Sequence, residues 1–338
     1  MKKLFVFLGV AFMAIGSVVS AQEVDSMAPL QKSSWGDAKT SEDVDHIPEV
    51  SLKMRGGYGQ DFEGNAGRFY GDGLYLNVDG KINSSFSYSW NQRLASTYYE
   101  SNAGFEGTNW LTLTYEVGDF AFTAGKDGIF VGSFEYDTDD LDSYSDMNSL
   151  FYNNFDCWQW GISAAWYPSD SHEFLVQTAN SPYSFGEPNL FAYAAAWRGY
   201  WDRYESYWSA NLWQYEKGEY IKSLNFGNRF YFGNLTLDLE YMARATEFRS
   251  LLGEEFTAMI RPSYEWDWGR AFAKFGVENY CDDESSNSLS INTFFGAGIE
   301  YFPLKENKNI RLHASWASNS FGYSALNLGL TWLINFTN

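Results

Sequence analysis

Cysteine, histidine, proline and positive charge are all scarce in this sequence of 338 residues. It has 2 Cys, 3 His and 7 Pro, and 23 Lys+Arg stand against 43 Asp+Glu, for a formal net charge of −20. So few cysteines exclude a disulfide-stapled scaffold, and a chain without surplus cations is not expected to bind nucleic acid. No zinc-spaced Cys/His set, Gly-rich phosphate loop or cofactor fingerprint occurs, so we expect neither a metal nor a cofactor.

Long apolar runs are also missing, except at the N-terminus. Lys2 and Lys3 precede an apolar run that ends in Val19-Ser20-Ala21, which predicts a signal peptide over 1–21. A membrane anchor is the alternative, but ~16 apolar residues are short for a span. No later run is long enough for a transmembrane helix. Residues 22–49 are polar and lack a period, and we expect them to form a flexible periplasmic leader.

Aromatic residues are abundant instead, at 20% of the chain. From Val50 onward, segments of about eight to twelve residues alternate apolar and polar side chains and end in turn residues, which predicts β-strands. In the clearest segment the apolar side chains are Leu326, Leu328, Leu330, Trp332, Ile334 and Phe336. Arg, Asp and Glu fall on the less apolar faces and aromatics gather at strand ends, a pattern that favours a membrane barrel over a soluble β-sandwich.

We therefore predict an all-β fold, an antiparallel transmembrane β-barrel of about 16 strands over residues 50–338. Short turns such as Gly233-Asn234 alternate with longer stretches such as 59–73 and 135–155, as expected for periplasmic turns and external loops. One strand is expected to span 120–134. A barrel of this size is expected to hold an aqueous channel rather than a packed interior.

Charged residues on the polar faces of these strands are candidates for the channel wall. The predicted basic positions are Lys53, Arg55, Lys81, Arg93, Arg198, Arg229, Arg244, Arg261, Lys274 and Arg311, and the predicted acidic positions are Asp79, Glu116, Asp238, Glu240, Glu278 and Glu300. The cations outnumber the anions although the whole chain is acidic, and charged rings in a water-filled pore sort ions by sign. The alternative is that these charges mostly pair with one another, and the sequence leaves both open.

Several segments resemble one family of membrane channels. The segments are Leu74–Ile82 with Phe86–Tyr88, Phe122–Lys126 with Gly132–Asp137, Gln177–Pro182 and Gly227–Phe230. They resemble the phosphate-selective porin O and P family, in the form common in Bacteroidetes. The resemblance implies a 16-stranded trimeric channel for small hydrophilic solutes or ions in the lipid of a Gram-negative outer membrane, with anions such as phosphate bound in the best-known members. Those members carry external lysines where this chain carries acidic loops, which leaves anion and cation preference open.

The longest predicted external loop, 135–155, is strongly acidic. Its carboxylates are Glu135, Asp137, Asp139, Asp140, Asp142 and Asp146. In many general porins the corresponding loop folds inward and narrows the channel, and here it would oppose a basic wall with an acidic constriction. The alternative is a solvated loop near the outer leaflet. The spacing lacks the glycine and terminal Glu of an EF-hand, so no metal site is expected.

The leading interpretation is a passive diffusion channel, and the alternative is an occluded barrel that binds a partner or acts as a scaffold through its external loops. His313 and Ser315 are similar to the His-x-Ser pair of outer-membrane phospholipases. Strand parity places them on the lumen side, away from lipid, so we expect no enzyme. Cys157 and Cys281 are predicted nearly across the barrel from each other, and we expect two unpaired thiols.

Overall fold

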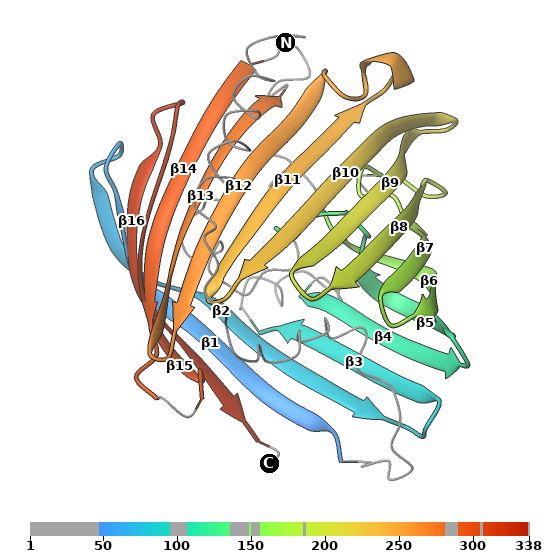
Figure 1. Ribbon diagram of the computed structural model, residues 1–338, viewed down its shortest axis with the longest axis horizontal. Helices are drawn as coiled ribbons and strands as arrows, with labels where there is room; N and C mark the ends of the chain where they lie inside the picture. The colour runs from blue at the N-terminus through green and yellow to red at the C-terminus, as the bar shows by residue number, and fades with distance from the viewer. Residues whose placement is uncertain are drawn as a thin grey trace. The chain divides into compact units, whose positions relative to one another are not determined.

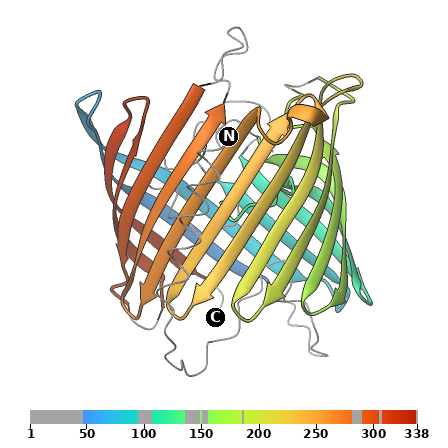
Figure 2. The same ribbon diagram turned by 45° about the horizontal axis from the view of Figure 1, so that its top comes forward.

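Residues 47–94, 107–135, 149, 156–184, 187–280, 290–304 and 307–336 are described by the computed structural model. They form a closed barrel in which each strand pairs antiparallel with its neighbours in sequence, and β1 pairs with β16 to close the ring (Figure 1). Figure 2 shows the tilted strands side by side in the barrel wall. The predicted antiparallel barrel of 16 strands is therefore confirmed. No helix among the described residues is long and apolar enough to cross a membrane.

The strands differ by only a few residues from most of the predicted segments. They are β1 (Glu49–Asp61), β2 (Ala66–Lys81), β3 (Phe86–Arg93), β4 (Thr108–Val117), β5 (Phe120–Gly128), β6 (Trp158–Ser169), β7 (His172–Asn180), β8 (Phe191–Trp201), β9 (Tyr204–Glu216), β10 (Glu219–Phe232), β11 (Leu235–Ala245), β12 (Glu255–Trp266), β13 (Gly269–Tyr280), β14 (Ser290–Tyr301), β15 (Ile310–Asn319) and β16 (Ser324–Asn335). A short 3₁₀ helix, η3 (Phe248–Ser250), connects β11 to β12.

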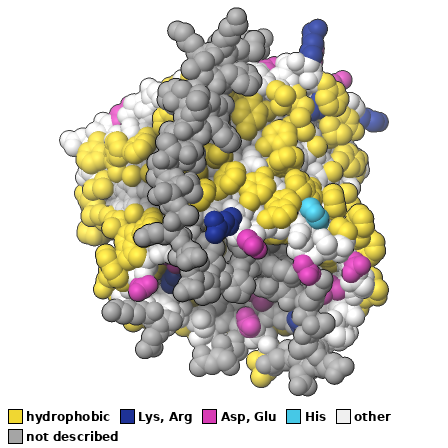
Figure 3. All heavy atoms as spheres, viewed as in Figure 1, with side chains coloured by type: hydrophobic (Ala, Val, Ile, Leu, Met, Phe, Trp, Pro, Cys, Tyr) yellow, Lys and Arg dark blue, Asp and Glu magenta, His cyan; other side chains and the backbone are white. Residues whose placement is uncertain are grey.

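The two faces of the wall differ in polarity because side chains alternate along each strand. Trp166, Phe174, Trp197 and Trp208 follow one another across β6, β7, β8 and β9 in the strand registers, on the face that carries the exposed apolar side chains. Hydrophobic side chains gather in broad yellow patches on the molecular surface turned to the viewer in Figure 3. The intervening positions face the interior, which is the arrangement of a barrel with an apolar outside.

Connections at one end of the barrel are short turns, as predicted. Gly118 and Gly233 lie in the β4–β5 and β10–β11 turns with φ of 58° and 64°, a conformation that glycine adopts at little cost. The predicted long loop over 59–73 is wrong, because β1 and β2 extend until only residues 62–65 connect them. Asp61 Oδ1 accepts hydrogen bonds from the backbone N–H groups of Glu63 and Gly64 at 2.9 and 3.2 Å. Because the Asp61 side chain accepts hydrogen bonds from the N–H groups of the turn, two long strands can be joined by a short connection.

The predicted strand over 120–134 is also too long, since β5 ends at Gly128. Residues 129–135, here called the inward segment, leave the wall and pack against the interior face. Its apolar side chains pack with inward residues in two clusters, namely Ile129 and Val131 with Ala179, Ala192, Trp213, Met242, Met259 and Phe294, and Phe130 and Phe134 with Ala121, Ala165, Leu175, Ala194, Ala196 and Tyr207. The expectation of an unpacked interior is therefore wrong for this side of the barrel.

Candidate functional site

The inward segment is held first by polar side chains of β7 and β9. The backbone N–H of Phe130 donates to Gln177 Oε1 at 3.0 Å, and its carbonyl accepts from Asn211 Nδ2 at 2.6 Å. Gly132 N donates to Ser209 Oγ at 2.8 Å. A Cβ atom on Gly132 would lie 2.5 Å from the backbone nitrogen of Ser209, so only glycine allows the segment to lie this close to the wall.

The middle of the segment is bound to β11 and β12. Glu240 accepts hydrogen bonds from the Ser133 hydroxyl and from Phe134 N, the latter at 3.0 Å. Arg261 Nη2 donates to the Phe134 carbonyl at 3.3 Å. The Arg229 guanidinium lies 4.2 Å from the centre of the Phe134 ring, a cation–π contact that desolvation strengthens. Phe134 is 0% exposed, so the segment is fully enclosed by interior side chains at this point.

The end of the segment is fixed on β13. Glu135 Oε1 accepts from Lys274 Nζ at 2.5 Å, and neither side chain is exposed. The backbone N–H of Ser149 donates to Glu135 Oε1 at 2.8 Å and its hydroxyl to Oε2 at 2.6 Å. Every oxygen of this buried carboxylate is therefore hydrogen-bonded, as a buried charge requires. The inward segment thus spans the interior from β7 to β13.

Every predicted wall residue lies on the inward face by strand register, but these residues divide into two groups. On β8 to β14, around the inward segment, they are buried or nearly so: Arg198, Arg229, Arg244, Arg261, Lys274, Asp238, Glu240, Glu278 and Glu300. On β1 to β4 and β15 they keep solvent exposure: Lys53, Arg55, Lys81, Arg93, Arg311, Asp79 and Glu116. Solvent therefore reaches mainly the second group.

In the buried group most charges are paired. Asp238 Oδ1 accepts from Arg229 at 2.7 Å and Oδ2 binds Arg261. Arg244 pairs with Glu255. Glu278 accepts from Thr257 and Asn292, and Glu300 pairs with Arg270 at 2.8 Å. Mutual pairing, one of the two alternatives left open by the sequence, describes this side of the barrel.

Inward charges that sequence reasoning missed include Glu173, Glu205, Glu255 and Arg270. Glu173 faces Arg198 across β7 and β8, and Glu205 lies opposite Arg229 on β9 and β10. Strand parity could have found them, because each lies two residues from an inward position on its strand. Three of the four are acidic, so the cationic excess expected for the wall is smaller on this side.

The exposed group lies on a polar wall with its own hydrogen-bond rows. Asn109 Nδ2 donates to Asn91 Oδ1 at 2.6 Å, Asn91 donates to Asn77, and Asn77 donates to Ser51 Oγ at 3.3 Å. This row crosses β4, β3, β2 and β1 in order. Arg93 lies over the Tyr75 ring at 5.5 Å. These hydrogen bonds hold the neutral side chains of this wall in place. The cationic side chains are its main charged feature.

The acidic loop is only partly described. Glu135 belongs to the buried anchor rather than to a solvated loop, whereas Asp137, Asp139, Asp140, Asp142 and Asp146 lie outside the described residues. Within the described part of the chain, no group of three or more His, Cys, Asp and Glu side chains is arranged to hold a metal ion. Cys157 is a free thiol and Cys281 lies outside the described residues.

The His313 and Ser315 pair faces the interior, as strand parity predicts. His313 Nε2 lies 3.2 Å from Asn327 Oδ1, and Ser315 is 3% exposed with no hydrogen-bond partner for its hydroxyl among the described residues. A nucleophilic serine needs a base within hydrogen-bond reach, and this hydroxyl has none.

Comparison with known proteins agrees with the barrel fold. The family model of phosphate-selective porin O and P matches residues 52–198. A triple mutant of Rh. blastica porin is similar in structure, with a TM-score of 0.59 and 11% identity over 85% of this chain and 100% of that chain. OmpT, an outer membrane protein of Vibrio cholerae in its trimer form, has a TM-score of 0.58 and 11% identity over 85% of this chain and 99% of that chain. No curated protein matches the sequence. The chain therefore has the closed-barrel fold of these porins and resembles the phosphate-selective porin O and P family over residues 52–198.

Proposed function

We propose that small hydrophilic solutes and ions diffuse along the side of the barrel formed by β1 to β4, β15 and β16, with anions such as phosphate preferred. The observation that carries this proposal is the division of the wall. Inward charges around the inward segment are buried and mostly paired, whereas Lys53, Arg55, Lys81, Arg93 and Arg311 keep solvent exposure. They outnumber the inward acids of these strands that keep solvent exposure, which are Glu49, Asp61, Asp79 and Glu116.

The sign of the preference follows from this accessible wall rather than from the net charge of the chain. Fixed cations that line a water-filled path raise the local concentration of anions and lower that of cations. The carboxylates on β8 to β14 contribute less, because they are buried against arginine or lysine partners. The family match supports anions as the solute class.

Planar-bilayer recording of the reconstituted protein tests this proposal. Stable conductance steps with a reversal potential that indicates anion preference in a salt gradient are expected, together with a decrease in chloride current when phosphate is added. A cation-directed reversal potential would contradict the proposed path. Phosphate that leaves the chloride current unchanged would contradict phosphate as a bound solute.

The second candidate is an occluded barrel that acts as a binding or scaffold protein through its external loops. The observation that favours it is the apolar packing of Ile129, Phe130, Val131 and Phe134 inside the barrel. Folded, reconstituted protein without conductance steps would support this candidate over the channel.

We also propose that the chain assembles as a homotrimer in outer-membrane lipid. Support comes from the trimer form of the Vibrio cholerae protein that it resembles in fold. Light scattering of the purified protein, corrected for detergent, is expected to give three copies per particle. A mass of one copy would contradict the trimer.

A further inference from the structure

The connection between β11 and β12 folds back over the outer face of the barrel wall. It spans 246–254, contains η3, and lies at the barrel end opposite the short turns (Figure 1). Tyr241 faces outward on β11, and its hydroxyl donates to the Leu252 carbonyl at 2.5 Å. Lys222 faces outward on β10, and its Nζ donates to the Thr246 carbonyl. The connection is therefore bound to the outside of the wall near both of its ends.

Burial supports this position. Ala243 and Ala245 alternate with the inward side chains of Met242 and Arg244, so they face outward, yet both are buried. Leu251 in the connection is buried as well. Outward side chains of a membrane barrel face lipid unless another part of the protein covers them, and the connection is bound at this place. It therefore forms a second layer outside β11.

The exposed side chains of this layer combine apolar and cationic groups. Phe248 and Leu252 are 73% and 59% exposed, and Lys222 Nζ lies 5.2 Å from the centre of the Phe248 ring. Arg249, next to Phe248, is almost fully exposed. Figure 3 shows dark blue Lys and Arg side chains at the upper right edge of the molecule, beside hydrophobic patches. Such a surface is typical of the boundary between the headgroups and the acyl chains of a membrane.

Both cations keep the capacity to bind an anion. Arg249 Nε donates to Glu247 Oε2 at 2.8 Å, whereas its two terminal nitrogens have no hydrogen-bond partner among the described residues. Lys222 Nζ donates to the carbonyl oxygens of Thr246 and Tyr220, and none of the ion pairs found in the described part of the chain includes it. The N–H groups at the end of a guanidinium match two oxygens of a phosphate.

We propose that the β11–β12 connection binds a phosphorylated lipid of the outer leaflet, with acyl chains against Phe248 and Leu252 and a headgroup phosphate on Arg249 and Lys222. Apolar contact and attraction to an anionic headgroup act together at such a site. The apolar part continues the lipid-facing wall of β10 and β11, and the cations lie beside it. This inference rests on the proposed outer-membrane location of the barrel, but not on which solute crosses it.

The test measures thermal unfolding of the purified protein in a neutral detergent while lipid A, which carries two phosphates and several acyl chains, is added. A higher Tm is expected, because a ligand that binds only the folded state stabilises it. The same glycolipid without its phosphates is expected to need a several-fold higher concentration for the same shift. Inorganic phosphate at equal concentration is expected to leave the Tm unchanged, since it lacks acyl chains. Phe248→Ser and Arg249→Gln are each expected to weaken the response to lipid A several-fold.

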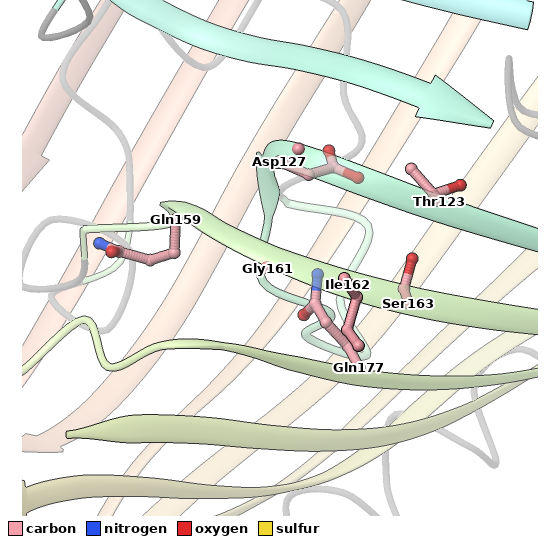
Figure 4. Close-up of a pocket in the computed structure, with 8 residues that line it drawn as sticks. Thr123, Asp127, Gln159, Gly161, Ile162, Ser163 and Gln177 are labelled. Carbon is pink, nitrogen blue, oxygen red and sulfur yellow. The ribbon is translucent and has the colours of Figure 1, made fainter. Parts of the chain in front are cut away.

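Ile162→Ser is the matched control for Phe248→Ser. Ile162 is 64% exposed on the outer face of β6, and Figure 4 shows that it and its inward neighbour Ser163 point to opposite sides of the strand. Arg203→Gln is the control for Arg249→Gln, because Arg203 is an exposed cation in the short β8–β9 turn at the other end of the barrel. Both control variants are expected to keep the full response to lipid A.

Equal Tm shifts with and without the lipid phosphates would overturn the proposal, and so would equal losses in the control variants. A second copy of the chain is the other occupant that such a surface could take. If Phe248→Ser lowers the particle mass measured by light scattering and leaves the lipid response unchanged, the surface is a contact between copies and the proposal is wrong. A protein that conducts in bilayers without any response to lipid A would overturn this inference alone and leave the proposed channel standing.

Discussion

The ammonium group of Lys274 on β13 lies 2.5 Å from Oε1 of Glu135 at the end of the inward segment, and neither side chain is exposed to solvent. The pair joins two residues that are far apart in sequence and that a surface loop would keep apart. Ser149 donates twice to the same carboxylate. Because the pair is desolvated, removal of one partner leaves an uncompensated buried charge.

Lys274→Met is therefore expected to lower the free energy of unfolding by about 3–5 kcal/mol, the usual cost of breaking a buried ion pair. It is also expected to release the end of the inward segment and increase fluctuations of the open-channel current. Denaturant unfolding and bilayer recording measure the two effects. Glu135→Gln added to Lys274→Met removes the unpaired charge and is expected to recover part of the stability.

The matched control for Lys274→Met is Lys308→Met. Lys308 pairs with Glu265 at 2.5 Å, but the two side chains are 56% and 43% exposed. An exposed pair is worth less than about 1 kcal/mol. Equal destabilisation by the two substitutions would show that the buried pair does not hold the segment.

The exposed basic wall should determine ion preference. Replacement of Arg55, Arg93 and Arg311 together by Gln is expected to shift the reversal potential toward cation preference, because these side chains contribute positive charge to the solvent-exposed wall. The matched triple replacement is Arg229, Arg244 and Arg261 to Gln. It is expected to lower stability more than it changes the reversal potential, since these arginines are buried or nearly so against Asp238 and Glu255.

A larger shift from the buried triple variant than from the exposed one would contradict the proposed path. The sequence alone predicts a shift for the buried set, since parity places both sets on the same face. Parity reports which face a side chain occupies. It carries no information about which part of that face another segment covers.

The barrel was predictable because its signal is local. Period-2 alternation places Leu328, Leu330 and Trp332 on the outer face without knowledge of their partners, and the register between β15 and β16 agrees. The inward segment was not predictable in the same way. In the sequence, Ile129 and Val131 alternate with Phe130 and Gly132 as the two faces of a strand do. The side chains that bind this segment are about fifty or more residues away in sequence, such as Gln177 for Phe130 and Ser209 for Gly132.

Glycines on β1 should decide how well the barrel closes. A Cβ atom on Gly57 would lie 2.2 Å from the Leu328 carbonyl oxygen on β16, so Gly57→Ala must push the two strands apart. We expect loss of the heat-modifiable folded band on a gel. Gly71→Ala is the matched control, because its nearest atom would be the Arg55 carbonyl oxygen at 4.0 Å. Equal folded fractions for the two variants would contradict a tight seam between β1 and β16.

The Cys157 thiol, just before β6, should react slowly in the folded protein. Burial and the neighbouring Asp156 carboxylate raise the pKa of this thiol from 9.0 to about 12. The thiolate is the reactive form. At a pH below the pKa, each unit by which the pKa rises lowers the thiolate population tenfold. At pH 8, labelling of a Cys281→Ser variant with a maleimide is therefore expected to be about 10³-fold slower than that of an ordinary thiol.

The rate should rise tenfold for each pH unit and level off only as the pH approaches the raised pKa. Asp156→Asn removes one of the two causes, so it is expected to lower the pKa of Cys157 and speed the reaction at pH 8. The same variant in denaturant serves as the reference, because unfolding exposes the thiol and restores its ordinary pKa. Labelling at pH 8 that is as fast in the folded as in the unfolded protein would show that Cys157 is neither buried nor held protonated by its surroundings.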